Sequence, residues 1–252
     1  MQPIFCPTPN DLESITKNAD RVLSLADVHL TDDYYYASLP LCVIHAVYSI
    51  GVRYEGARRL VARYCARTDQ LRVHVDRCSF PEKSQQESIT VFCQRFEQVG
   101  LEGMTSDYFG NRQRTSARSG ILKAEAVHRF AKVLQHFETE YFQDIAQLAN
   151  SADFENAIRS IPGQGSGISL QYFWMLAGSD DLVKPDRMII RFLETALDRK
   201  VNVPEALPLL RAVATVLSEK YLQLTPRLLD YAIWQYQRKP SSGAANCVDN
   251  NG

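Results

Sequence analysis

Apolar residues recur along this chain at intervals of three and four, which is the spacing of one face of an α-helix. One such stripe runs through Leu12, Ile15 and Ala19, and Thr8 followed by Pro9 is typical of its N-cap and first turn. The pattern predicts a protein built almost entirely of helices. Further stripes predict helices within residues 127–137, 154–161, 168–176, 186–196, 210–221 and 225–236.

The segment Leu41–Ile50 is apolar nearly all round and is interrupted only by His45 and Ser49. A helix of this kind has no polar face to turn towards water, so we expect it in the centre of the core. Strand-like alternation is limited to residues 71–75 and 89–93, and the second stretch also fits a helix. We therefore predict an all-α fold without a substantial sheet.

A glycine-rich turn, IPGQGSG at residues 161–167, joins two of the predicted helices. Its backbone N–H groups and the N-terminus of the next helix would form a site suited to a phosphate. A dinucleotide-binding loop has similar glycines, but it follows a buried strand, whereas residues 154–161 have helical spacing. An ordinary helix connection with glycines at its corner is the alternative. Gly165 is a candidate for a positive backbone φ. The expected phosphate contacts are Gly163, Gly165, Ser166 and Gly167.

Asp186 follows this turn by about twenty residues, directly after Pro185, and opens the next apolar helix. The commonest role for an aspartate in such a place is that of an N-cap. The second possibility is chemical, because cleavage of an N-glycosidic bond develops positive charge on the sugar. A nearby carboxylate stabilises that charge and orients or deprotonates a water molecule. We expect Asp180 and Asp181, in the preceding turn, at the surface.

Together, the turn and Asp186 resemble the signature of the helix-hairpin-helix (HhH-GPD) DNA glycosylases, a base-excision superfamily with Leu-Pro-Gly-x-Gly followed by a catalytic aspartate. Here IPGQG at 161–165 stands in the place of the family pattern. Bifunctional members carry a lysine nucleophile two positions after the second glycine, where this chain has Gly167. The resemblance implies a two-lobed helical fold with its hairpin motif at about 154–177, monofunctional excision, and Asp186 as the catalytic carboxylate. It is strongest over residues 150–195 and weaker over 40–150.

The resemblance also implies how DNA is held. In the family, an inter-helix turn enters the minor groove and fills the gap left by the extruded base, which is bound in a cleft between the lobes. Here the chain passes Gly51 into an arginine-rich helix, and Ile50, Val52 or Tyr54 is the candidate wedge. Core packing is the alternative for Tyr54 and for Trp174. The expected groove contacts are Arg53, Arg58, Arg112 and Arg114, and the expected base-pocket residues are Tyr35, Tyr36 and Trp174.

The formal net charge of −1 argues against a generic basic nucleic-acid coat protein. Cations are nevertheless concentrated in two segments: residues 53–77 hold seven arginines against three carboxylates, and residues 112–123 hold four cations and no carboxylate. Both segments are candidates for phosphate contacts, and the loop 111–120 is also a candidate for closing over the base. Solvated helix faces and an exposed loop would account for the same residues without DNA.

Six cysteines are scattered without a C-x-x-C pair, so neither a zinc ribbon nor a disulfide framework is indicated. Iron–sulfur members of the resembled family carry four closely spaced cysteines after the catalytic helix, where this chain has only Cys247. The five histidines lack metal-ligand spacing, and His45 has the setting of a buried histidine. We expect no metal and no cofactor, and most of the cysteines buried as small hydrophobes.

No apolar run approaches the roughly 20 residues that span a bilayer, and the N-terminus lacks a basic segment followed by an apolar one. We expect a cytoplasmic monomer whose partner is double-stranded DNA and which binds no membrane. Residues 1–239 are predicted to form one two-lobed domain. The small, polar tail 240–252 is predicted to be disordered.

The expected function is hydrolysis of the N-glycosidic bond of a flipped, damaged or modified base in DNA, which leaves an abasic site. Repair and defence against phage with modified bases are both compatible with it, and the sequence does not name the base. One alternative is a non-catalytic helix-hairpin-helix DNA-binding protein, which the near-neutral charge favours. A helical protein-interaction scaffold without DNA function is the other.

Overall fold

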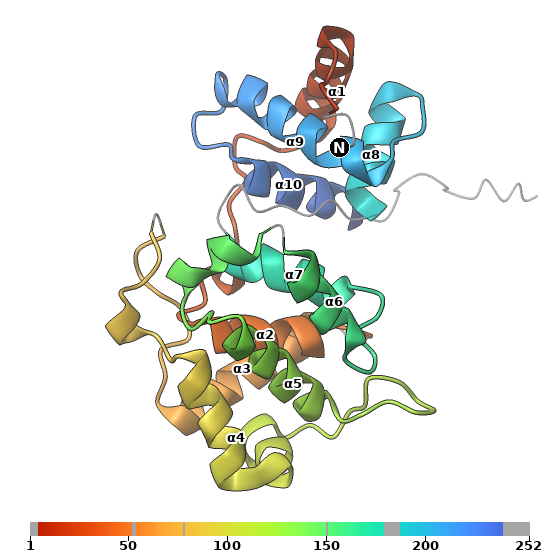
Figure 1. Cartoon of the computed structure of the whole chain (residues 1–252). Coiled ribbons are helices and arrows are strands. Elements are labelled where there is room, and N and C mark those ends of the chain that lie inside the picture. Colours follow the sequence, from red (N-terminus) through yellow and green to blue (C-terminus); the bar gives the residue numbers. More distant parts are fainter. Residues whose placement is uncertain (1–4, 52–53, 78, 150, 179–186, 239–252) are drawn as a thin grey trace, which may run out of the picture. The chain divides into compact units, whose positions relative to one another are not determined.

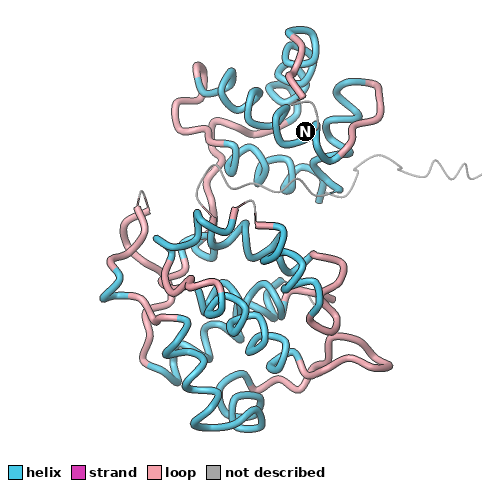
Figure 2. Tube along the Cα trace, in the orientation of Figure 1, coloured by secondary structure: helices cyan, strands magenta, loops and turns pink. Residues whose placement is uncertain are grey.

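The computed structural model describes residues 5–51, 54–77, 79–149, 151–178 and 187–238, with the exception of the side chain of Tyr54. Contacts divide the chain into two compact units, residues 30–184 (unit 2) and residues 1–29 with 185–252 (unit 1). Helices dominate the described part of both units (Figures 1 and 2). The α-helices are α1 (Pro9–Val22), α2 (Leu39–Tyr48), α3 (Tyr54–Thr68), α4 (Ile89–Gly103), α5 (Lys123–His136), α6 (Ala152–Ser160), α7 (Ile168–Ala177), α8 (Arg187–Leu197), α9 (Val203–Ser218) and α10 (Pro226–Arg238).

The all-α prediction is confirmed for the described residues. The ambiguous stretch 89–93 is the first part of α4, because Ser88 accepts a hydrogen bond from the amide of Val91 and caps a helix there. The other strand-like stretch forms only an isolated bridge between Tyr36 and Val73. The described residues contain isolated bridges of this kind and no β-strand.

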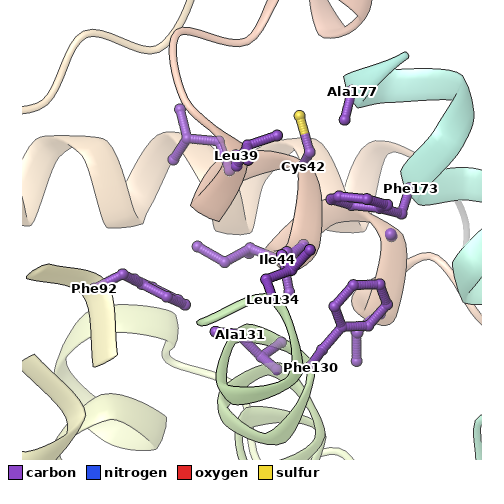
Figure 3. Close-up of a cluster of buried hydrophobic side chains, with 14 of the residues drawn as sticks. Leu39, Cys42, Ile44, Phe92, Phe130, Ala131, Leu134, Phe173 and Ala177 are labelled. Carbon is purple, nitrogen blue, oxygen red and sulfur yellow. The ribbon is translucent and has the colours of Figure 1, made fainter. Parts of the chain in front are cut away.

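Helix α2 runs through the middle of unit 2, with α3, α5 and α7 around it (Figure 1). All ten of its residues are buried, as its nearly continuous apolar sequence predicts. Figure 3 shows side chains of α2, including Leu39 and Ile44, in one buried cluster with Phe92 of α4, Phe130 of α5 and Phe173 of α7. The central helix is therefore the common packing partner of α3, α4, α5 and α7, while α6 packs on α5.

Between α4 and α5 the chain passes through a π-helix, η3 (Met104–Phe109), that the sequence analysis did not predict. Arg63 donates a hydrogen bond of 3.2 Å to the carbonyl of Ser106, and Arg67 donates one of 3.1 Å to the next carbonyl. Gly110 then ends the π-helix at a φ of 59°. Two arginines of the predicted cationic segment 53–77 thus satisfy carbonyl groups at the end of η3.

Unit 1 joins the N-terminal helix to the three C-terminal ones. Helix α1 packs against α8 and α9, and α10 packs against the same two helices. Thr8 caps α1 with its side chain, as predicted, and Lys220 and Tyr221 both bind Asp20 of α1, at 2.8 and 2.7 Å. The chain therefore leaves unit 1 after His29, builds unit 2, and re-enters unit 1 at residue 185.

A membrane-spanning helix would have to be longer and more apolar than any helix in the part of the chain that the structure describes.

Candidate nucleic-acid interface

Residues 161–167, called the hairpin below, form two successive tight turns between α6 and α7. The amide of Gln164 donates to the carbonyl of Ile161, and the amide of Gly167 donates to the carbonyl of Gln164, both at 2.9 Å. Ile161 and Gln164 are buried, with exposed fractions of 5% and 1%. The buried pair fixes the hairpin to the body of unit 2 and leaves Gly163, Gly165 and Ser166 exposed.

Positive φ angles occur at Gly163 (85°) and Gly167 (74°), and the φ of Gly165 is not positive. The expectation of a positive φ at Gly165 is therefore wrong. A β-carbon built on Gly165 would lie 3.7 Å from its nearest neighbour, the carbonyl oxygen of Arg159, which is ordinary contact. The hairpin needs glycine at its two left-handed positions, where an L side chain would be strained.

Gly165 and Ser166, two exposed residues, lie just before helix α7. Among the described residues, no group accepts a hydrogen bond from either amide. Gly167, the N-cap of α7, has no side chain, and the amide of Ile168, the first residue of the helix, donates to Oγ of Ser166 at 3.4 Å. These donors and the positive end of the helix dipole together suit an anion such as a phosphate.

Arg159, in the last turn of α6, reaches across the hairpin. Its Nη1 donates to the carbonyl of Gly165 at 3.4 Å, and a β-carbon on Gly167 would lie 2.6 Å from its guanidinium. The absence of a side chain at Gly167 is therefore what allows the guanidinium to lie against the backbone there. This places a positive charge against the hairpin backbone at Gly165 and Gly167.

Residues 111–122, called the arginine loop below, fold back on themselves between η3 and α5. The amide of Thr115 donates to the carbonyl of Ile121 at 2.9 Å, and Arg114 forms an isolated antiparallel bridge with Leu122. The Arg114 guanidinium also donates to the carbonyl of Gly120 at 2.7 Å. A β-carbon on Gly120 would lie 2.1 Å from the amide nitrogen of Ser116, so the closure of this loop requires glycine.

The arginine loop packs directly on the hairpin. A β-carbon on Gly163 would lie 2.3 Å from Cβ and 2.5 Å from Oγ1 of Thr115, so the Thr115 side chain occupies the space beside the α-carbon. The two segments are 48 residues apart in the sequence. Two elements that were predicted separately as phosphate contacts are therefore neighbours in the folded unit.

Lys123 connects the arginine loop to the end of α2. Its Nζ donates hydrogen bonds to the carbonyls of Ile50 (2.7 Å) and Tyr48 (3.3 Å) and to Oε1 of Gln113 (3.2 Å). The side chain is buried, and burial lowers the pKa of Lys123. The predicted groove turn, the arginine loop and the hairpin therefore meet on one side of unit 2.

The sequence pattern marks Lys123 only as one of several loop cations. A signal was present, because Lys123 is the first residue of α5, where a cation opposes the helix dipole. A lysine in that position needs a hydrogen-bond acceptor outside its own helix. Here the acceptors are the carbonyl of Tyr48, the last residue of α2, and the carbonyl of Ile50 in the turn that follows.

Two of the predicted groove arginines have carboxylate partners. Arg58 pairs with the fully buried Asp33 (Nε to Oδ2, 2.8 Å), and Arg112 pairs with Glu102. Arg58 therefore offsets a buried negative charge, a role that its sequence position did not indicate.

Tyr36 and Trp174 lie in the core, with exposed fractions of 0% and 1%. Trp174 makes edge-to-face contacts with Phe154 and Phe173. Their rings have no exposed face on which a base could stack, which corrects the base-pocket prediction for these two residues. Tyr35 is half-buried, and its ring lies below the Arg77 guanidinium, 4.6 Å from the centroid.

The Tyr36 hydroxyl belongs to a buried polar network. It donates to Oδ1 of Asp33 at 3.1 Å and shares a hydrogen bond of 2.7 Å with Nδ1 of His45. Burial lowers the pKa of His45 to about 4. This confirms the prediction that His45 is a buried histidine.

Several predicted site residues lie outside the described residues, namely Asp186, Val52 and Arg53. Tyr54 is the first residue of α3, and Ile50 is half-buried with its carbonyl bound by Lys123. Asp186 directly precedes Arg187, the first residue of α8. The expected tail, 240–252, also lies outside the described residues.

A family model described as a domain of unknown function, DUF8548, matches residues 13–238. The chain belongs to this family. No curated protein and no solved structure gives a significant match. The matched region includes the hairpin, the arginine loop and Asp186, so the candidate interface lies within the DUF8548 domain.

Three cysteines of this DUF8548 domain, Cys42, Cys65 and Cys93, are buried, as expected of small hydrophobes. Burial raises the pKa of Cys65 and of Cys93 to about 11, which makes them poor metal ligands and nucleophiles. Across the described ranges, no group of three or more His, Cys, Asp and Glu is placed to hold a metal ion.

Proposed function

We propose that this DUF8548 protein is a monofunctional DNA glycosylase of the helix-hairpin-helix type. It hydrolyses the N-glycosidic bond of a flipped, damaged or modified base in double-stranded DNA. The observation that carries the proposal is the hairpin itself, a helix–turn–helix connection with exposed amide donors at the N-terminus of α7. We also propose that its helices form the HhH-GPD fold and that it acts on DNA in the cytoplasm, in repair or in defence against phage with modified bases.

The neighbourhood of the hairpin supports a DNA backbone as its ligand. Thr115 brings the arginine loop against it, and Lys123 brings the turn at Ile50 to the same side of the unit. Backbone amides and arginines bind phosphates without reading sequence, so they position the duplex. In this proposal the turn that contains Ile50 enters the minor groove where the base is extruded.

Asp186 supplies the chemistry in this proposal. As the glycosidic bond breaks, its carboxylate stabilises the positive charge on the sugar and accepts a proton from the attacking water. The water oxygen bonds to the anomeric carbon, and the base leaves with the bonding electron pair and takes up a proton. Gly167 stands where bifunctional enzymes carry their lysine, so no covalent imine forms and the strand stays intact.

The two-unit organisation is compatible with the two lobes of such an enzyme. Helix α7, which follows the hairpin, belongs to unit 2. Helix α8, which begins one residue after Asp186, belongs to unit 1. In the sequence, Asp186 is the second residue of the segment with which the chain returns to unit 1.

The test is excision on a panel of duplexes with damaged or modified bases, followed by cleavage of abasic sites with alkali. Asp186→Asn should fold and bind DNA, while its single-turnover excision rate falls on the order of a hundredfold or more. Asp153→Asn is the matched control, because Asp153 is an exposed aspartate in the first turn of α6.

Three outcomes would contradict the proposal in different ways. Excision by Asp186→Asn near the wild-type rate would reduce Asp186 to a helix cap. Salt-sensitive binding with every glycosidic bond intact would support the non-catalytic DNA-binding alternative. Absence of salt-sensitive DNA binding by the wild type would leave the interaction-scaffold alternative.

A further inference from the structure

The cations around the hairpin differ in how they are compensated. Arg58 and Arg112 face carboxylates, and Lys123 is buried against carbonyls. By contrast, Arg118 and Arg159 are exposed, and no described carboxylate lies within ion-pair distance of either one. These two arginines therefore carry net positive charge on the surface of unit 2.

Both arginines belong to segments with a fixed backbone. Arg118 lies at the tip of the arginine loop, which is closed by the hydrogen bond from Thr115 to Ile121 and by the tight approach of Gly120 to Ser116. Arg159 lies in α6 and leans on the hairpin backbone at Gly167. The contact between Thr115 and Gly163 joins the two segments that carry these charges.

These two segments carry positive charge and unpaired amide donors together. The Arg159 guanidinium binds the carbonyl of Gly165, and none of the described residues accepts a hydrogen bond from the amides of Gly165 and Ser166. Planar guanidinium groups and fixed amides are both favourable partners of phosphate oxygens. A polyanion with regularly repeated charges fits such a surface better than a single small anion would.

We propose that the arginine loop and the hairpin act as one rigid clamp on the backbone of duplex DNA, with Arg118 and Arg159 each binding a phosphate. The inference rests on the proposed function and adds two residues to it, together with the device that holds them, the packing of Thr115 on Gly163. The clamp positions the duplex and takes no part in bond cleavage.

The experiment measures binding to an unmodified duplex over a range of salt concentrations, because phosphate contacts do not depend on a target base. Log affinity falls as log salt rises, and each of Arg118→Gln and Arg159→Gln should reduce the magnitude of this negative slope by about 0.9, the double variant by about twice that. Between 50 and 200 mM salt, each single variant should then lose about 3.5-fold less affinity than the wild type does. Arg129→Gln is the control, because Arg129 already pairs with Glu125 on α5.

The outcomes separate the clamp from the proposed function. An unchanged slope for Arg118→Gln, with a less steep slope for Arg159→Gln, would overturn the clamp, because the arginine loop would then make no phosphate contact through Arg118. Unchanged slopes for both variants, with excision intact, would overturn it completely and leave the glycosylase proposal standing. Wild-type protein without salt-dependent binding would overturn both. Circular dichroism and thermal unfolding of each variant exclude misfolding as the cause.

Discussion

The Nζ of Lys123 donates a hydrogen bond of 2.7 Å to the carbonyl of Ile50, 73 residues earlier in the chain. The same amine binds the carbonyl of Tyr48 and the side chain of Gln113. One buried lysine thus holds the arginine loop to the end of the central helix.

Replacing Lys123 by methionine should destabilise the protein and weaken DNA binding. The methionine keeps much of the volume but leaves two carbonyls without their donor, at a cost of about 1–3 kcal/mol for each buried group that stays unsatisfied. Chemical denaturation measures this loss. Lys132→Met is the control, because Lys132 forms an exposed pair with Glu97 that is worth at most about 1 kcal/mol. Equal stability of the two variants would show that the Lys123 contacts are dispensable.

Two glycines of the hairpin should respond differently to substitution. Gly163→Ala should destabilise the protein by on the order of 1–3 kcal/mol, because its φ is 85° and Thr115 occupies the space of the new β-carbon. Gly165→Val should fold, because the nearest atom to its β-carbon is 3.7 Å away, yet lose DNA affinity through bulk beside the amides. Unfolding curves and binding at matched salt distinguish the two effects. Wild-type affinity of folded Gly165→Val would refute the phosphate-binding role of the hairpin.

Adjacent arginines of α3 offer a third test. Arg58→Gln should lower the free energy of unfolding by on the order of 1–3 kcal/mol, because it removes the cation that faces buried Asp33. The loss is smaller than for a fully buried pair because the Arg58 side chain is 32% exposed. Arg59→Gln should change stability by no more than about 0.5 kcal/mol, because Arg59 is exposed. Thermal and urea unfolding measure the difference. If both variants are equally stable, Arg58 does not stabilise the fold.

The buried His45 predicts a pH dependence of stability. In the unfolded chain His45 has the ordinary pKa of 6.5, whereas in the folded protein burial lowers the pKa of His45 to about 4. The free energy of unfolding should therefore fall as the pH drops from 6.5 to 4, with a total loss of about 3 kcal/mol from this group. His45→Gln should remove this component, and His136→Gln, at an exposed position, should retain it. A wild-type profile that His45→Gln leaves unchanged would contradict the assignment.

Local features of the fold were predictable from the sequence. The N-cap at Thr8, the buried helix α2 and the helix–turn–helix around the hairpin follow from patterns within a few residues. Such patterns suffice because helix periodicity and capping depend on neighbours three or four positions away. The π-helix η3 was missed, since its carbonyls are satisfied by Arg63 and Arg67 from another helix.

The roles of single large or charged residues were less predictable. Trp174 fits both a stacking platform and a core by its sequence, and only its packing against Phe154 and Phe173 decides for the core. Likewise, the sequence pattern of Arg58 is that of a surface cation, and only the fold pairs it with buried Asp33. Burial and ion pairing depend on which elements face each other, and that information is absent from local spacing.

The sequence by itself determined that this chain is helical, where its glycine hairpin lies, and which segments concentrate positive charge. Only the tertiary structure decided that Thr115 packs on Gly163, that Lys123 binds Ile50, and that the N-terminal helix joins the C-terminal unit. The physical reason is the range of the interactions. Backbone hydrogen bonds and helix periodicity are local, whereas these contacts join segments 48 or more residues apart, through packing of the whole core.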